Sequence, residues 1–236
     1  MKNKMMKGIL AFILILLVFA PVNQAEAAVK TGVVDVSSGT LNVRSGPGVN
    51  YKKVGSLKNT ARVTVYSIKS GWAQILYAKK KRYVSDDYLR FYSTMSPAAA
   101  KAISDKAYNA QLISKSKSYT KKQIYAILSP QFTQSFIDRY FTQQFRSAGK
   151  DSKGNALYHI LETDTWGLSL YPLDWQAKYQ PEKPTVTHFV KNGKSYLYIS
   201  QYRISEMERN HTATTCFVKE GNKWLVFDQR VKFDKK

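Results

Sequence analysis

Turn residues recur about every eight to twelve positions between residues 29 and 92, and this spacing leaves room only for short strands. Runs of alternating apolar and polar residues lie between the turns: "TGVVDV", "LNVRS", "KKVGSL", "ARVTVYSI", "WAQILYA" and "RYVSDDYL". Many short strands separated by tight turns are typical of a small barrel. We therefore expect a small all-β barrel over residues 28–92.

The tightest of these turns is Gly46-Pro47-Gly48, within "GTLNVRSGPGVNYKKVGSL". Glycine tolerates positive φ and proline fixes its own φ, so the chain can reverse sharply here. Arg44 leaves the strand just before the turn, and its guanidinium could fork onto a carboxylate or phosphate. The alternative is that Arg44 secures the turn by binding backbone carbonyls or Asp35.

The stretch "TLNVRSGPGVNYKKVGSL", with "GWAQILY" and "RYVSDDYL", resembles the bacterial SH3 domain of secreted cell-wall proteins over about residues 31–91. The resemblance implies a small β-barrel that targets its protein to the wall, often beside an amidase or peptidase domain. That family usually has glycine before the "YV" strand, whereas this chain has four basic residues in "AKKKRYV". This departure favours contact with a polyanion.

Basic and aromatic side chains of the barrel are the candidate wall-binding residues. The aromatic rings could form a platform for a peptide or a sugar, although Trp72 also fits a core position. The predicted set is Asn42, Arg44, Tyr51, Trp72, Lys79, Lys80, Lys81, Arg82, Tyr83 and Tyr88.

The first 27 residues have the pattern of a secretory signal peptide. Three lysines precede an apolar run that is too short to cross a bilayer, and small residues follow Pro21. We expect cleavage after Ala27 and a secreted or wall-associated protein, with retention of the segment as an anchor left open. The formal charge is +21, and loss of this segment would leave +19. Such a charge selects anionic partners, which outside a bacterium are peptidoglycan and teichoic acid rather than nucleic acid.

Composition and period change after residue 92. Alanine, serine and lysine dominate residues 93–120, which we expect to form a helical connector to an α+β domain over residues 121–236. Ser96-Pro97 and Ser129-Pro130 both predict helix starts, and Thr120 with Gln123 predicts a capping box. Apolar and aromatic residues from Ile124 to Phe145 recur at helical spacing and predict one core-facing stripe.

Strands follow the helices. Asn192-Gly193 favours a tight hairpin turn between alternating runs, and Gly221-Asn222 marks a second hairpin. Helices followed by antiparallel strands predict an α+β layer in which the helices pack on a curved sheet. An NTF2-like cone has this order of elements.

A loop rich in tryptophan and tyrosine separates the helices from these hairpins. Such loops often bind, because their rings combine an apolar body with a polar tip. The candidate pocket residues are Trp166, Tyr171, Asp174 and Trp175. The alternative is that this loop caps the open end of the sheet.

No pattern in the chain predicts a catalytic residue, a metal site or a cofactor. Cys216 is the only cysteine, follows all three histidines in the sequence, and lies in a predicted strand as a buried residue. His159 and Glu162 resemble one of the two ligand pairs of a zinc site, but on a strand their side chains would point to opposite faces.

These patterns together predict a non-catalytic, wall-associated protein. The SH3-like module would bind peptidoglycan or an anionic wall polymer, and the second domain would bind a ligand or a partner such as a wall enzyme. Two alternatives stay open: a wall hydrolase or transglycosylase with an unrecognised site, and a modulator that inhibits an autolysin.

Overall fold

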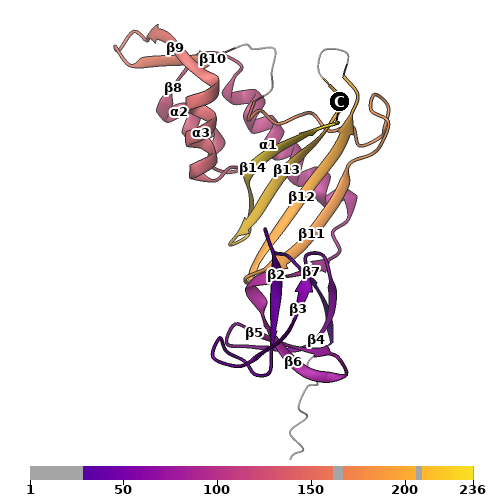
Figure 1. Cartoon of the computed structure of the whole chain (residues 1–236). Helices are drawn as coiled ribbons and strands as arrows, with labels where there is room; N and C mark the ends of the chain where they lie inside the picture. The colour runs from indigo at the N-terminus through magenta and orange to yellow at the C-terminus, as the bar shows by residue number, and fades with distance from the viewer. Residues whose placement is uncertain (1–28, 162–166, 206–208, 236) are drawn as a thin grey trace, which may run out of the picture.

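The computed structural model describes residues 29–161, 167–205 and 209–235 (Figure 1). The predicted signal peptide, residues 1–27, therefore lies outside the described residues. No helix within these ranges is long and apolar enough to cross a membrane.

Short strands build the N-terminal unit, as the turn spacing predicts. They are β1 (Lys30–Val34), β2 (Thr40–Arg44), β3 (Lys53–Lys58), β4 (Arg62–Lys69), β5 (Trp72–Tyr77), β6 (Lys80–Ser85) and β7 (Leu89–Ser93), with a 3₁₀ turn, η1 (Asp86–Tyr88), before the last strand. The strands curl round one apolar core, in which Val43, Ala73, Ile75, Val84 and Leu89 are fully buried.

The strands of this unit do not form a closed barrel, so that part of the prediction is wrong. Their ladders run in the order β7-β1-β4-β5-β6-β2-β3, and no ladder within the described residues joins β3 back to β7. The outer edge of β7 pairs instead with a strand of the second unit. The two units therefore share one antiparallel sheet, in which β7 is the common strand.

The second unit contains three helices and a further set of strands in the described residues. The elements are α1 (Pro97–Ser114), β8 (Tyr119–Thr120), α2 (Lys121–Leu128), α3 (Gln134–Gln144), β9 (Phe145–Lys150), β10 (Ala156–Ile160), β11 (Thr185–Lys191), β12 (Lys194–Arg203), β13 (His211–Glu220) and β14 (Lys223–Phe233). Strands β8, β10 and β9 form a separate small sheet. Figure 1 shows the long strands β11 to β14 rising from the N-terminal unit, with α1 crossing one face of their sheet.

Two of the three predicted helix starts are confirmed. Ser96 caps α1 through a hydrogen bond from the Ala99 amide, and Thr120 forms a full capping box with Gln123. The Ser129-Pro130 prediction is wrong, because Ser129 ends α2 and Thr133 caps α3.

The reason for the shift lies in the sheet. Thr133 donates its amide to the Val226 carbonyl at 2.9 Å, and the Val226 amide donates to the Gln131 carbonyl at 2.8 Å. Phe132 is therefore bridged to β14 and Thr133 is extended, so α3 begins only after Thr133.

The predicted core stripe is confirmed for one face of α3. Phe136, Ile137 and Tyr140 are buried, and they pack with Leu197 of β12 and Phe217 of β13. Helix α1 presents a seam of small residues to the same core, including Ala100 and Ala107. The helices thus cover one face of the sheet, which is the layer arrangement that the sequence predicts; nothing in the described structure tests the NTF2-like cone.

Asp35 joins the two units on the sheet surface. Its carboxylate accepts hydrogen bonds from Arg90 of β7 and, at 2.5 Å, from Lys191 at the end of β11. Burial by itself raises the pKa of Asp35, but the hydrogen bonds and charges of these two cations outweigh it and hold the pKa below its ordinary value. The ionised form is therefore favoured in the folded chain.

The Asp35 contacts predict an acid-sensitive junction. Because its folded pKa is depressed, Asp35 contributes stability above its ordinary pKa of 3.8, and this contribution is lost as the pH falls through the folded value. We expect Asp35→Asn to lower the free energy of unfolding by about 1–3 kcal/mol at pH 7 and by less at pH 3, because the stabilisation by the ionised carboxylate shrinks as the pH falls below 3.8. Urea unfolding at both pH values measures this, with exposed Asp87→Asn as the control. A penalty independent of pH would contradict the assignment.

Candidate binding site

The glycine-proline turn is held closed by its neighbours. Arg44 donates from Nη1 to the Tyr51 carbonyl at 2.9 Å, which closes the loop from behind. The Tyr51 ring covers Gly46 so closely that a Cβ added there would lie 2.3 Å from its Cδ1 atom. Glycine is therefore needed at position 46, and the structural role considered for Arg44 is present, through a carbonyl rather than through Asp35.

A groove of about 340 Å³ opens beside this turn. It brings together four of the predicted wall-binding residues, Asn42, Arg44, Trp72 and Tyr88. The remaining lining side chains include Val36, Leu41 and Val49 and the hydroxyls of Ser37, Ser38, Thr40 and Ser85. Apolar side chains, several hydroxyls and one guanidinium make a polar groove with aromatic walls, which suits a short polar ligand.

The other predicted residues do not line this groove. Tyr51 covers the turn, and Tyr83 lies in β6, where its hydroxyl accepts a hydrogen bond from Gln74 at 3.0 Å. Lys79, Lys80 and Lys81 are exposed on the β5–β6 hairpin, and Arg82 follows them along β6. The prediction therefore divides into a groove and a separate basic hairpin.

That hairpin turns without glycine. Ala78 and Lys79 both have positive φ, 49° and 60°. These left-handed values suit a tight primed turn, in which glycine is ordinarily favoured. The turn directs Lys79, Lys80 and Lys81 to solvent, and half-buried Arg82 follows them on β6.

The predicted pocket loop of the second unit is docked on the body of that unit. Trp166 lies outside the described residues. Tyr171 is buried, with its ring 5.2 Å from that of His211. Asp174 and half-buried Trp175 line a shallow hollow of about 400 Å³, and Trp175 also packs against the main core.

The Asp174 carboxylate organises the loop. It accepts backbone hydrogen bonds from Tyr179 at 2.5 Å, Gln180 at 2.9 Å and Gln176 at 3.2 Å. These bonds, led by that of Tyr179, lower the pKa of Asp174 to about 2. Its oxygens are thus already engaged, which favours the cap interpretation of this loop.

Two buried glutamines that the sequence analysis did not single out hold the same loop. Gln201 of β12 accepts from the Asp174 amide at 2.9 Å and donates to the carbonyls of Asp174 and Glu182 at 3.0 and 2.7 Å. Gln111 of α1 accepts from the Leu170 amide at 2.8 Å. A signal was present for Gln201, because it continues the inward alternation of Leu197 and Ile199.

One hydroxyl-imidazole pair has the distance of a catalytic dyad. Ser93 Oγ lies 2.8 Å from His188 Nδ1, but His188 Nε2 is buried without a hydrogen-bond partner in the described chain. A serine nucleophile needs a histidine base whose other nitrogen is oriented by a third group. No described residue hydrogen-bonds to Nε2 of His188 in this way. Cys216 is fully buried, and burial raises the pKa of its thiol to about 12, so a thiolate is disfavoured. No group of three or more His, Cys, Asp or Glu in the described ranges could hold a metal ion.

The glutamine contacts predict that loop docking depends on Gln201. Gln201→Ala leaves three backbone groups of the loop without their partner, and we expect a loss of about 2–3 kcal/mol in the free energy of unfolding. Hydrogen exchange should accelerate at the Asp174 amide while the β2 and β5 amides stay protected. Gln176→Ala, an exposed change in the same loop, is the control. Unchanged exchange at Asp174 would show that the loop is held by other contacts.

The comparisons with known proteins concern the N-terminal unit. Residues 39–90 match the family described as the bacterial SH3 domain. The "Probable endopeptidase p60" of Listeria seeligeri is 46% identical over 66 residues, which are 27% of this chain and 13% of that protein. The protein of the same name from Listeria welshimeri is 43% identical over 70 residues, 29% of this chain and 13% of its own length. The predicted resemblance is confirmed: residues 39–90 of this chain are a bacterial SH3 domain.

Proposed function

We propose that this protein is an exported, non-catalytic cell-wall protein, whose SH3 domain binds peptidoglycan or an anionic wall polymer and whose second unit binds a partner or ligand. The observation that carries the proposal is the groove that gathers Asn42, Arg44, Trp72 and Tyr88 inside a confirmed bacterial SH3 domain. Half-exposed Tyr88 and half-buried Trp72 offer ring faces to a peptide or sugar, and Arg44 offers a cation at the same place.

Charge supports an anionic partner for the basic hairpin. Residues 29–92 contain 12 basic and 3 acidic residues, and Lys79, Lys80 and Lys81 are exposed together. Exposed cations on one hairpin raise the local concentration of a polyanion and do not demand a shaped pocket. The groove and the hairpin thus have separate roles, because the groove recognises a wall unit and the hairpin holds the charged polymer around it.

The absence of catalysis in this proposal rests on the state of the reactive groups. The named relatives are endopeptidases by name, but the matched stretch is only 13% of each, so their activity does not transfer with it. In the chain itself, the Cys216 thiol is buried and protonated, and the Ser93-His188 pair lacks an orienting group. A binding role needs none of these groups.

Co-sedimentation with purified sacculi tests the division between groove and hairpin. We expect Tyr88→Ala with Asn42→Ala to weaken binding about tenfold whether or not teichoic acid is present, because the groove contacts the wall itself. Lys80→Glu with Lys81→Glu should weaken binding only to sacculi that carry teichoic acid, and more at low than at high salt, since exposed charges are screened within about 8 Å at physiological salt.

Lys122→Glu with Lys219→Glu gives the matched control, because it changes the net charge equally on exposed sites of the second unit. If this control weakens binding as much as the hairpin variant does, the attraction is diffuse and the hairpin has no special role. If the groove variant binds like wild type, the groove is not the wall-binding site.

Incubation with purified sacculi tests the absence of catalysis. We expect no release of muropeptides by the full chain, and Cys216→Ala should bind sacculi as wild type does while losing on the order of 1 kcal/mol of stability. Chromatography of the soluble fraction measures the release, with a known wall hydrolase as the positive control. Muropeptide release by wild type that disappears in Cys216→Ala would overturn the non-catalytic assignment.

A further inference from the structure

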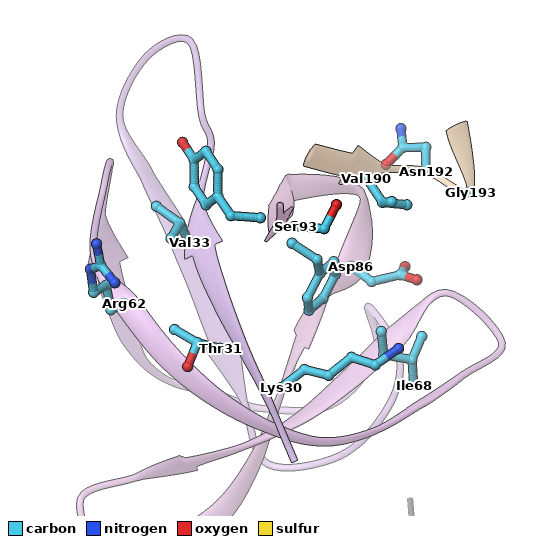
Figure 2. A pocket seen from close by; sticks show the side chains of 12 residues that line it. Lys30, Thr31, Val33, Arg62, Ile68, Asp86, Ser93, Val190, Asn192 and Gly193 are labelled. Atoms are coloured by element: carbon cyan, nitrogen blue, oxygen red, sulfur yellow. The ribbon is translucent and has the colours of Figure 1, made fainter. Parts of the chain in front are cut away.

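A hollow of about 640 Å³, larger than the SH3 groove and the loop hollow, lies where the SH3 domain meets the second unit. Figure 2 shows Arg62, Thr31 and Val33 on one side of it, Lys30, Ile68 and Asp86 on the other, and the β11–β12 turn above Asp86. Its remaining lining residues are Phe91, Tyr92, Ser93, Val190, Asn192 and Gly193. Neither the SH3 groove nor the loop hollow shares a residue with it.

The hollow lies where two neighbouring strands, β1 and β7, stop pairing with each other. The Asp35 amide donates to the Tyr88 carbonyl at 2.9 Å, and Val33 lies opposite Arg90 in the same antiparallel register. The next hydrogen-bonding position in that register, two residues along, would pair Thr31 with Tyr92, and no ladder bond joins them. On the N-terminal side of Val33, β1 continues to pair with β4 but not with β7. Strand β7 continues to pair with β11 there.

The separation of β1 from β7 leaves backbone N–H and C=O groups facing the hollow. Val34 exchanges hydrogen bonds on its β4 side, with the Ala61 carbonyl and the Thr60 amide, so Val33 and Thr31 must face β7. The same alternation turns Tyr92 toward β1, because Tyr88 already bonds in that direction. Thr31 and Tyr92 therefore present unpaired strand edges to each other across the hollow.

The walls and rim add apolar and charged contacts. Val33, Ile68, Phe91 and Val190 supply apolar surface, and the Phe91 ring packs against Gly32, 3.3 Å from an added Cβ. Lys30 and Arg62 form no ion pair with any residue in the described ranges, and neither does Asp86. Two unpaired cations against one carboxylate give the rim a net positive charge.

We propose that this junction hollow binds an extended, acidic segment of a partner protein, which pairs with the open edges at Thr31 and Tyr92. Addition of a strand to an open edge takes affinity from main-chain hydrogen bonds and specificity from alternate side chains. Apolar side chains of the segment lie against Phe91 and Val190, which are neighbours across the β7–β11 pair, and its acidic groups meet Lys30 and Arg62. A lipid chain would leave the backbone groups unpaired, and a second copy of this strongly basic chain would be repelled by Lys30 and Arg62.

A fluorescein-labelled hexapeptide of alternating valine and glutamate is the probe, and its fluorescence anisotropy with the full chain is the measurement. We expect saturable binding that weakens about tenfold when a central valine is replaced by proline, which cannot donate to a strand. Replacement of glutamate by lysine should weaken it similarly. If the peptide does not bind, or binds equally with proline, the proposal is wrong.

The variant Lys30→Glu with Arg62→Glu tests the location. We expect about tenfold weaker peptide binding, against less than about threefold for Lys53→Glu with Lys58→Glu, which makes the same charge change on β3. Thr31→Pro removes an amide that faces the hollow and no ladder bond to β4, so it should also weaken binding. Equal loss in both charge variants would overturn the proposal.

Sacculus binding separates this inference from the proposed wall binding. The junction variant should co-sediment with sacculi as its β3 control does, because the SH3 groove is untouched. Loss of peptide binding with sacculus binding retained supports the separate site. Loss of sacculus binding in the junction variant alone would place the wall ligand in the hollow and contradict the peptide assignment.

Discussion

The pairing of β7 on both edges is the constraint on which the architecture depends. A strand has two edges, and β7 gives one to β1 in the SH3 domain and the other to β11 in the second unit. This explains why the SH3 strands do not close on themselves, and why no flexible linker separates the units. Asp35 reinforces the arrangement, since its partners Arg90 and Lys191 come from the two strands that pair at the junction.

Local features of the fold were predictable because their causes are local. The Asn192-Gly193 hairpin is confirmed by pairing of Lys191 with Lys194 and by positive φ at both turn residues. The caps at Ser96 and Thr120 depend on a side chain and an amide three residues apart. The Ser129-Pro130 prediction failed because a distant strand, at Val226, holds the following residues extended.

The candidate sites show the same contrast. Four of the ten predicted wall-binding residues, Asn42, Arg44, Trp72 and Tyr88, line one groove, and all four lie within the stretch that matches the bacterial SH3 domain. The loop contacts of Gln111 and Gln201 and the approach of Ser93 to His188 had no comparable pattern, since each joins segments far apart in the chain. The junction hollow was also hidden, because it results from the separation of two strands, which no single stretch of sequence encodes.

The length of strand β12 sets the distance between the SH3 junction and the loop hollow. It begins at Lys194, beside the turn that touches the SH3 domain, and ends at Arg203, which lines the loop hollow. The ten residues of β12 rise about 3.3 Å each, so the strand spans roughly 30 Å. Whatever surface the SH3 domain holds, the loop around Trp175 is therefore held at that fixed distance from the junction.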